Sequence, residues 1–144
     1  MTDVAPIPDG YPRLIPYLSV AGAADAIAFY TTVLGAKERM RMPGPGGSVG
    51  HAELEIGDSL VMLADEHPDM SQPSPKTLGG TPVSLMVYVE DADAVFAGAL
   101  AAGATEVQPL EDKFYGDRSG TFADPWGHVW HVASHIEDVS EEEM

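Results

Sequence analysis

The sequence predicts an α+β fold in which two βαβββ modules follow one another along the chain. The first observation is an internal repeat, because residues 17–38 (YLSVAGAADAIAFYTTVLGAKE) and residues 86–107 (MVYVEDADAVFAGALAAGATEV) share one pattern. In both, an alternating strand ends at a valine, an alanine-rich segment follows, and that segment stops at a Gly-Ala pair. The second observation is that each repeat leads into three strand-like runs. Such self-similarity indicates two copies of one supersecondary unit.

Each alanine-rich segment is expected to form an amphipathic helix. Apolar residues recur at helical spacing in both segments: Ile27, Tyr30, Val33 and Leu34 in the first, and Val95, Phe96, Ala99 and Leu100 in the second. Asp91 is placed to cap the second helix at its N-terminus. Gly35 and Gly103 suit the left-handed residue that ends a helix.

The remaining strands are expected in the runs that follow the helices. They are AKERMRM, HAELEIG and SLVMLAD in the first module, and TEVQPLE, SGTFAD and HVWHVAS in the second. The Gly-Asp pair in EIGDSL predicts a tight hairpin between two of them.

These elements divide the chain into five parts. We expect an N-terminal extension over residues 1–11, module 1 over 12–66, a linker over 67–82, module 2 over 83–136 and an acidic tail over 137–144. The linker is expected because proline and adjacent glycines concentrate there.

Composition excludes several classes of function. The formal net charge is −16, which repels phosphate backbones and anionic lipid surfaces, so we expect neither nucleic-acid nor membrane partners. The same charge attracts cationic ligands at long range, or simply keeps the protein soluble. There is no cysteine, no signal-peptide pattern and no long apolar run, so the expected location is the cytoplasm.

The chain resembles the vicinal oxygen chelate superfamily, which includes glyoxalase I, extradiol dioxygenases and bleomycin-resistance proteins. The stretches PYLSVAGAADAIAFYTTVLGA, HAELEIGDSLVMLADE and YGDRSGTFADPWGHVWHVASH are most similar to its PhnB-like branch. The resemblance covers roughly residues 12–136. It implies that the two sheets enclose a cup-shaped cavity, either within one chain or completed across a homodimer, and a homodimer is expected.

The resemblance also implies where a metal would bind. Metalloenzymes of the superfamily take ligands from the first and last strand of each module, which here correspond to Ile15, Met62, Ser84 and His131. Only His131 is a good ligand for a divalent ion, and isoleucine cannot coordinate one. We therefore expect no metal site and no cofactor.

Three histidines near the C-terminus could suggest a metal site of their own. His128 and His131 are three residues apart, so in a strand they point to opposite faces. His131 and His135 share a face but lie roughly 13 Å apart at about 3.3 Å per residue. No two of them can therefore chelate one ion in a strand.

Alternation along the strands predicts which side chains face the cup. Three sets of apolar residues are expected to pack under the helices: Leu14, Leu18 and Val20; Ala52, Leu54 and Ile56; and Leu85, Val87 and Val89. The cup side is then expected to carry Tyr17, His51, Glu53, Met62, Met86, Tyr88 and His131. A buried Glu53 would need a partner such as Arg118, or a raised pKa. Arg118 itself either pairs near Asp117 or meets an anionic ligand group.

These residues support three hypotheses about function. The first is a metal-free small-molecule-binding protein, like the resistance members of the superfamily, with an acidic surface and Glu53 favouring a cation. The second is a metal-independent lyase-, isomerase- or dioxygenase-type enzyme with His131, or His51 with Glu53, as acid or base. By family analogy it would act on a small carbonyl or phosphonate-related compound. The third is a metalloenzyme with displaced ligands, for example His51, Glu53 and His131.

Overall fold

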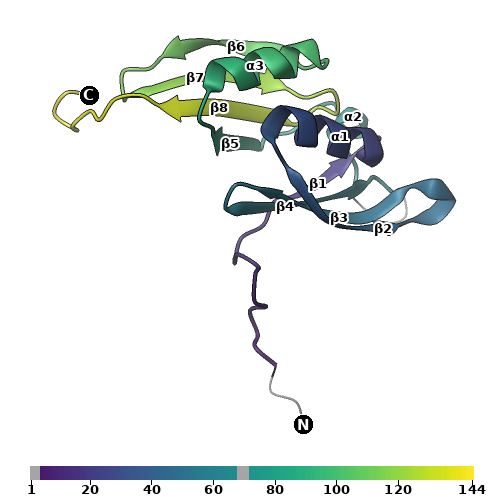
Figure 1. Cartoon of the computed structure of the whole chain (residues 1–144). Helices are drawn as coiled ribbons and strands as arrows, with labels where there is room; N and C mark the ends of the chain where they lie inside the picture. The colour runs from purple at the N-terminus through teal and green to yellow at the C-terminus, as the bar shows by residue number, and fades with distance from the viewer. Residues whose placement is uncertain (1–3, 68–71) are drawn as a thin grey trace. The chain divides into compact units, whose positions relative to one another are not determined.

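The computed structural model describes residues 4–67 and 72–144, which fall into two compact units over residues 1–70 and 71–144. Each unit contains one four-stranded mixed sheet with a helix on one face (Figure 1), so the predicted α+β fold of two tandem βαβββ modules is confirmed. The cup and the homodimer remain predictions. Among the described residues, no helix is long and apolar enough to cross a lipid bilayer.

The first unit contains module 1. Its elements are β1 (Tyr17–Val20), α1 (Ala23–Leu34), β2 (Lys37–Pro43), the short 3₁₀ turn η1 (Pro45–Gly47), β3 (Val49–Ile56) and β4 (Ser59–Asp65). The sheet order is β1-β4-β3-β2, with β1 parallel to β4 and the other pairs antiparallel. The second unit repeats this plan with β5 (Ser84–Tyr88), α3 (Ala92–Ala101), β6 (Thr105–Asp112), β7 (Asp117–Ala123) and β8 (Val129–His135), in the order β5-β8-β7-β6.

The core of each module lies between its helix and its sheet. In module 1, Ile27 and Tyr30 of α1 are buried, as are Val20, Leu54 and Leu63 of the sheet. In module 2, the rings of Phe96 on α3 and Phe122 on β7 meet edge to face with centroids 6.4 Å apart. Gly120 permits this packing, since a Cβ there would lie 2.8 Å from the Phe96 ring.

The last strand of each module also caps the module's helix. Asp65 at the end of β4 accepts hydrogen bonds from the backbone N–H groups of Gly22 and Ala23 at the start of α1. At the equivalent place in β8, Ser134 accepts a hydrogen bond from Ala92 N–H of α3. These caps satisfy donors that a helix leaves free in its first turn and tie helix to sheet. The predicted cap by Asp91 is confirmed, with Ala94 N–H donating at 3.1 Å.

One prediction about the core is wrong. Leu14 is 87% exposed, because β1 begins only at Tyr17 and Pro16 has no N–H with which to extend the ladder. Leu85, Val87 and Val89 keep their predicted face, since they are half-buried and alternate with exposed residues, and Ile56 is also half-buried. The predicted linker contains a one-turn helix, α2 (Pro75–Leu78), and residues 68–71 of it lie outside the described residues.

Candidate functional site

A chain of four polar side chains crosses module 1 on the face of the sheet opposite α1. The Tyr17 hydroxyl lies 2.8 Å from Nδ1 of His51, and Nε2 of His51 lies 3.0 Å from one carboxylate oxygen of Glu53. The Tyr11 hydroxyl donates to the other oxygen of Glu53 at 2.9 Å. The β-sheet sets this arrangement, since His51 and Glu53 are two residues apart on β3 and therefore share a face.

Glu53 is the buried centre of this network, with only 4% of its surface exposed. The hydrogen bond from His51 lowers the pKa of the Glu53 carboxyl below its usual 4.5, and together with that from Tyr11 it outweighs burial, which would raise it. Glu53 is therefore ionised at neutral pH. When Nε2 of His51 donates to this carboxylate, Nδ1 is left to accept a hydrogen bond from the Tyr17 hydroxyl. Burial, reinforced by the Glu53 charge, raises the pKa of Tyr17, which remains a proton donor.

The partner of Glu53 differs from the prediction. Arg118 was expected to neutralise it, or its pKa to be raised, whereas Tyr11 and His51 hold it ionised. Both carboxylate oxygens of Glu53 are engaged in these contacts, and the group keeps its negative charge.

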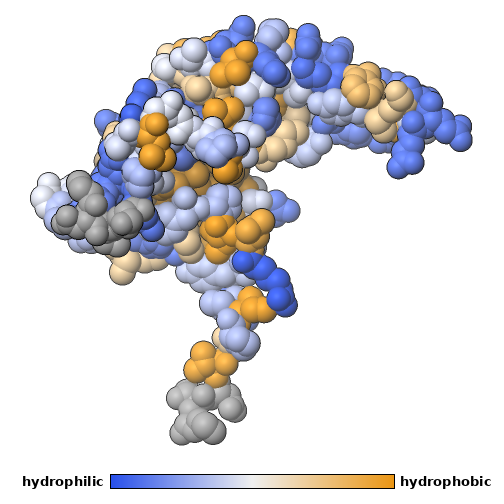
Figure 2. Space-filling model, turned by 180° about the vertical axis from the view of Figure 1, so that it is seen from behind, coloured by the Kyte–Doolittle hydropathy of each residue, from blue (hydrophilic) through white to orange (hydrophobic). Residues whose placement is uncertain are grey.

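The N-terminal segment is fastened to module 1 around Tyr11. The Arg39 guanidinium lies over the Tyr11 ring, 4.7 Å from its centroid, and Arg39 also donates to the Gly10 carbonyl at 3.0 Å. Tyr11 N–H donates to the Pro8 carbonyl, which closes a turn in the segment. Figure 2 shows hydrophobic side chains along this segment, and Val4 is 78% exposed.

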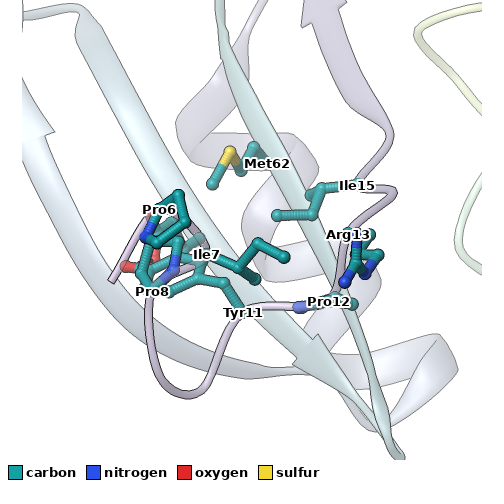
Figure 3. Close-up of a pocket in the computed structure, with 9 residues that line it drawn as sticks. Pro6, Ile7, Pro8, Tyr11, Pro12, Arg13, Ile15 and Met62 are labelled. Carbon is teal, nitrogen blue, oxygen red and sulfur yellow. Dashed lines mark hydrogen bonds between the residues drawn. The ribbon is translucent and has the colours of Figure 1, made fainter. Parts of the chain in front are cut away.

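A pocket of about 690 Å³ opens where this segment meets the sheet (Figure 3). Its lining consists of Pro6, Ile7, Pro8, Tyr11, Pro12, Arg13, Ile15, Glu53 and Met62. Figure 3 shows Ile7 between the Pro6 and Pro8 side of the pocket and the Ile15 and Arg13 side. The walls are thus mostly apolar with a few polar groups, which is typical of a small-molecule site.

The pocket contains two of the residues predicted from the sequence. Glu53 and Met62 line it. His51 and Tyr17 do not line it, but His51 is hydrogen-bonded to Glu53, and Tyr17 is hydrogen-bonded to His51. Tyr11 was missed because the N-terminal extension carries no motif, and its contact with Glu53 joins residues 42 positions apart.

Module 2 presents a second polar group on its own open face, opposite α3. His131 of β8 is hydrogen-bonded at both ring nitrogens, to Thr121 Oγ1 at 2.7 Å and to Ser84 Oγ at 3.0 Å. The sheet registers place Met86 beside His131 and Tyr17 beside Met62, so Met62 and His131 occupy equivalent positions in the two modules. Met86 is on the predicted face and is 48% exposed.

A third cluster lies at the end of the same face and was not predicted. Asp117 is buried, accepts a hydrogen bond from the Tyr88 hydroxyl at 2.7 Å and lies 2.8 Å from Nδ1 of His135. Nε2 of His135 lies 2.8 Å from Asp138. The bonds to Asp117 and Asp138 raise the pKa of His135 above 6.5. Burial alone would raise the pKa of Asp117, but the bonds from Tyr88 and His135 prevail and lower it. The sequence did indicate that His135 lies on the same face as His131, which is the face that carries this cluster.

The structure places Arg118 away from these clusters. It neighbours Ser134 on the α3 side of the sheet, where it forms a two-pronged ion pair with Asp93 of α3 and a further one with Asp112. The predicted pairing of Arg118 with Asp117 is therefore wrong, while its role as a ligand contact stays a prediction. The physical reason is strand alternation, because adjacent residues of β7 point to opposite faces.

Of the four positions that the family resemblance singled out as ligand positions, two lie in each module. Ile15 and Met62 line the pocket of module 1, and isoleucine offers no donor atom. In module 2, both nitrogens of His131 contact hydroxyl groups. Across residues 4–67 and 72–144, no three His, Asp or Glu side chains are arranged to hold a metal ion.

Comparisons with known proteins place these features in context. The sequence model of the Glyoxalase/Bleomycin resistance protein/Dioxygenase superfamily matches residues 14–132. An uncharacterised protein of Mycobacterium bovis is 46% identical over 136 residues, which cover 92% of this chain and 90% of the relative.

Two solved structures illustrate the shared fold. TioX of Micromonospora sp. ML1 is 30% identical, with a TM-score of 0.67 over 87% of this chain and 99% of TioX. The PhnB protein of Bacillus cereus is 21% identical, with a TM-score of 0.66 over 85% of this chain and 99% of PhnB. The predicted similarity to PhnB-like proteins is therefore confirmed at the level of the fold.

Proposed function

Because this chain belongs to the Glyoxalase/Bleomycin resistance protein/Dioxygenase superfamily, we propose that it binds a small organic molecule in the pocket of module 1, without a divalent metal. The observation that carries the proposal is the pocket itself, where apolar side chains of the N-terminal segment face Ile15 and Met62 beside the ionised Glu53. The apolar walls supply affinity through burial, and the few polar groups orient the ligand.

The pocket's polar groups support specific binding of one molecule rather than nonspecific adsorption of apolar compounds. Glu53 is fixed by Tyr11 and His51, so its charge and its two donors have defined positions before a ligand arrives. Preorganised groups lower the entropy that binding must overcome.

Metal independence is supported by the chemistry of the four superfamily positions. Neither Ile15 nor Met62 suits a hard cation, and Ser84 and His131 contact one another. Elemental analysis of protein purified without chelator should find less than one equivalent of metal. A stoichiometric metal that is lost in His131→Ala would contradict this part of the proposal.

The site is tested with N-phenyl-1-naphthylamine, a neutral apolar probe whose fluorescence rises on binding. Met62→Ala should weaken its binding roughly tenfold, since an apolar arm of this size is worth about 1.5 kcal/mol of contact. Met86→Ala, which removes the same side chain from module 2, is the control and should leave binding unchanged. Equal effects of the two substitutions would refute the assignment of the pocket.

A second candidate function follows from the Tyr17–His51–Glu53 chain. An ionised carboxylate that orients a histidine, which in turn accepts from a phenol, is an arrangement suited to general acid–base catalysis. In this function His51 takes the Tyr17 proton at Nδ1, and the phenolate oxygen so formed removes a proton from a substrate carbon; the Tyr17 residue is 46% exposed on the sheet face.

Hydrogen–deuterium exchange separates the enzyme from the binding protein. In D₂O, an acid–base enzyme should speed exchange at the carbon between the carbonyl and the phosphonate of phosphonoacetaldehyde, and His51→Gln should abolish the effect. If neither this compound nor a panel of small ketones exchanges faster than in buffer, the catalytic function is refuted and the binding function is retained. The displaced-ligand metal site is not proposed, because His51 and Glu53 bind each other while His131 is held within the other module.

A further inference from the structure

One arginine in the pocket differs from the others in the chain. Three arginines have a carboxylate oxygen within 4.0 Å. The partner is Glu55 for Arg39, Glu38 for Arg41 and Asp93 for Arg118. In the part of the chain that the structure describes, Arg13 has no such partner, although the protein has 23 acidic residues and only 7 basic ones. An unneutralised guanidinium beside an apolar pocket is available to a ligand.

The backbone around Arg13 is fixed by its neighbours. Tyr11, two residues before it, is hydrogen-bonded to Glu53, and Ile15, two residues after it, lines the same pocket. The ring of Pro12 further restricts the chain immediately before Arg13. Figure 3 shows Arg13 on the Ile15 side of the pocket. The guanidinium therefore extends from a tethered stretch of backbone rather than from a free end.

Glu53 sets the direction in which a charged ligand would lie. Its two oxygens are already occupied by Tyr11 and His51, and it is ionised, so an anionic group is repelled from that part of the pocket. Arg13 attracts the same group, and guanidinium binds carboxylate, phosphonate and sulfonate oxygens well because its N–H donors are arranged as a fork.

We infer that the ligand of this pocket carries an anionic group on an apolar body, and that Arg13 is the residue that selects the anion. This inference rests on the proposed function, since it assigns a chemical class to the ligand of the same pocket. It reverses the expectation, drawn from the net charge of −16, that the ligand is a cation. The apolar body lies against Ile7 and Met62, and the anionic group lies at Arg13.

Two probes with one aromatic framework test the inference. 8-Anilino-1-naphthalenesulfonate carries a sulfonate, and N-phenyl-1-naphthylamine is the same framework without it. Arg13→Gln should weaken binding of the sulfonate roughly tenfold, as expected for one charge-assisted contact, and should leave the neutral probe unchanged. Lys76→Gln removes the same charge from an exposed site in the other unit and should change neither affinity. Glu53→Gln should strengthen sulfonate binding, because it removes the repelling charge.

The two proposals fail in different ways. If the neutral probe does not bind, or if Met62→Ala and Met86→Ala affect it equally, the pocket assignment is overturned. If Met62→Ala weakens the neutral probe but Arg13→Gln changes both probes equally or neither, the pocket stands and the anion inference is overturned. Circular dichroism of each variant checks that the fold is kept.

Discussion

Replacing Asp124 by alanine should destabilise the protein strongly, because this side chain organises the DPWG turn before β8. Asp124 is 4% exposed. One of its oxygens accepts hydrogen bonds from the backbone N–H groups of Trp126 and His128, both at 3.0 Å. The other accepts from the indole N–H of Trp130, also at 3.0 Å. The turn leads directly into β8, the strand that contains His131.

The size of the effect follows from these three contacts. A hydrogen bond to a charged group contributes about 1.5–3 kcal/mol when its partner is removed, and bonds that share one acceptor are not fully additive. We therefore expect Asp124→Ala to lower the free energy of unfolding by about 3 kcal/mol, and the Tm by roughly 6–12 °C for a chain of this size. Asp124→Asn should cost less, since its amide oxygen can still accept the two backbone bonds while its NH₂ group opposes the indole N–H.

Urea unfolding followed by tryptophan fluorescence measures this directly, because the protein's two tryptophans, Trp126 and Trp130, both donate hydrogen bonds to Asp124. Asp58→Ala is the control, since Asp58 lies in the corresponding β3–β4 turn of module 1 but is exposed, with a single 3.5 Å contact to Ser59. A loss below about 1 kcal/mol in Asp124→Ala, or a loss equal to that in the control, would refute the assigned role of the motif.

Two further substitutions test other contacts. The folded-state pKa of His135 is raised above 6.5, so its contribution to stability is complete below pH 6.5 and is lost as the pH rises through the raised value. Urea unfolding between pH 5 and 9 should therefore show the gap between wild type and His135→Gln narrowing with pH, and a constant gap would contradict the ion pairs with Asp117 and Asp138. Arg118→Ala should leave the affinity for N-phenyl-1-naphthylamine unchanged, because Arg118 binds Asp93 on the α3 side of its sheet. A tenfold loss in a fluorescence titration would show that Arg118 does contact the ligand.

The repeated pattern made the fold predictable from sequence. Alternation in the strands and helical spacing in the alanine-rich segments are local signals, so the elements and the equivalence of the modules could be read directly. The expected correspondence of Met62 with His131 is confirmed by the sheet registers, which pair them with Tyr17 and Met86. The prediction that Leu14 packs in the core was wrong because Pro16 prevents β1 from extending back to Leu14. The proline is a local signal that the alternation argument overlooked.

The candidate site was less predictable because its contacts join distant parts of the chain. The face that carries Glu53 follows from strand alternation, but its partner Tyr11 lies in an extension without periodic pattern. For Arg118, the sequence shows a carboxylate beside an arginine and suggests that they pair. In β7 the side chains of Asp117 and Arg118 point to opposite faces, and Asp117 is hydrogen-bonded to His135 and Tyr88 instead. Tertiary pairing of this kind depends on which strands are neighbours, and adjacent residues in sequence do not report it.

Binding of a small molecule in the module 1 pocket is tested most directly by titrating ¹⁵N-labelled protein, in the presence of a chelator, with N-phenyl-1-naphthylamine. The largest amide shifts are expected at residues that line the pocket, notably Ile7, Tyr11, Ile15, Glu53 and Met62, and they should saturate with the Kd found by fluorescence. Shifts confined to β5 and β8 of module 2, or binding that the chelator abolishes, would contradict it.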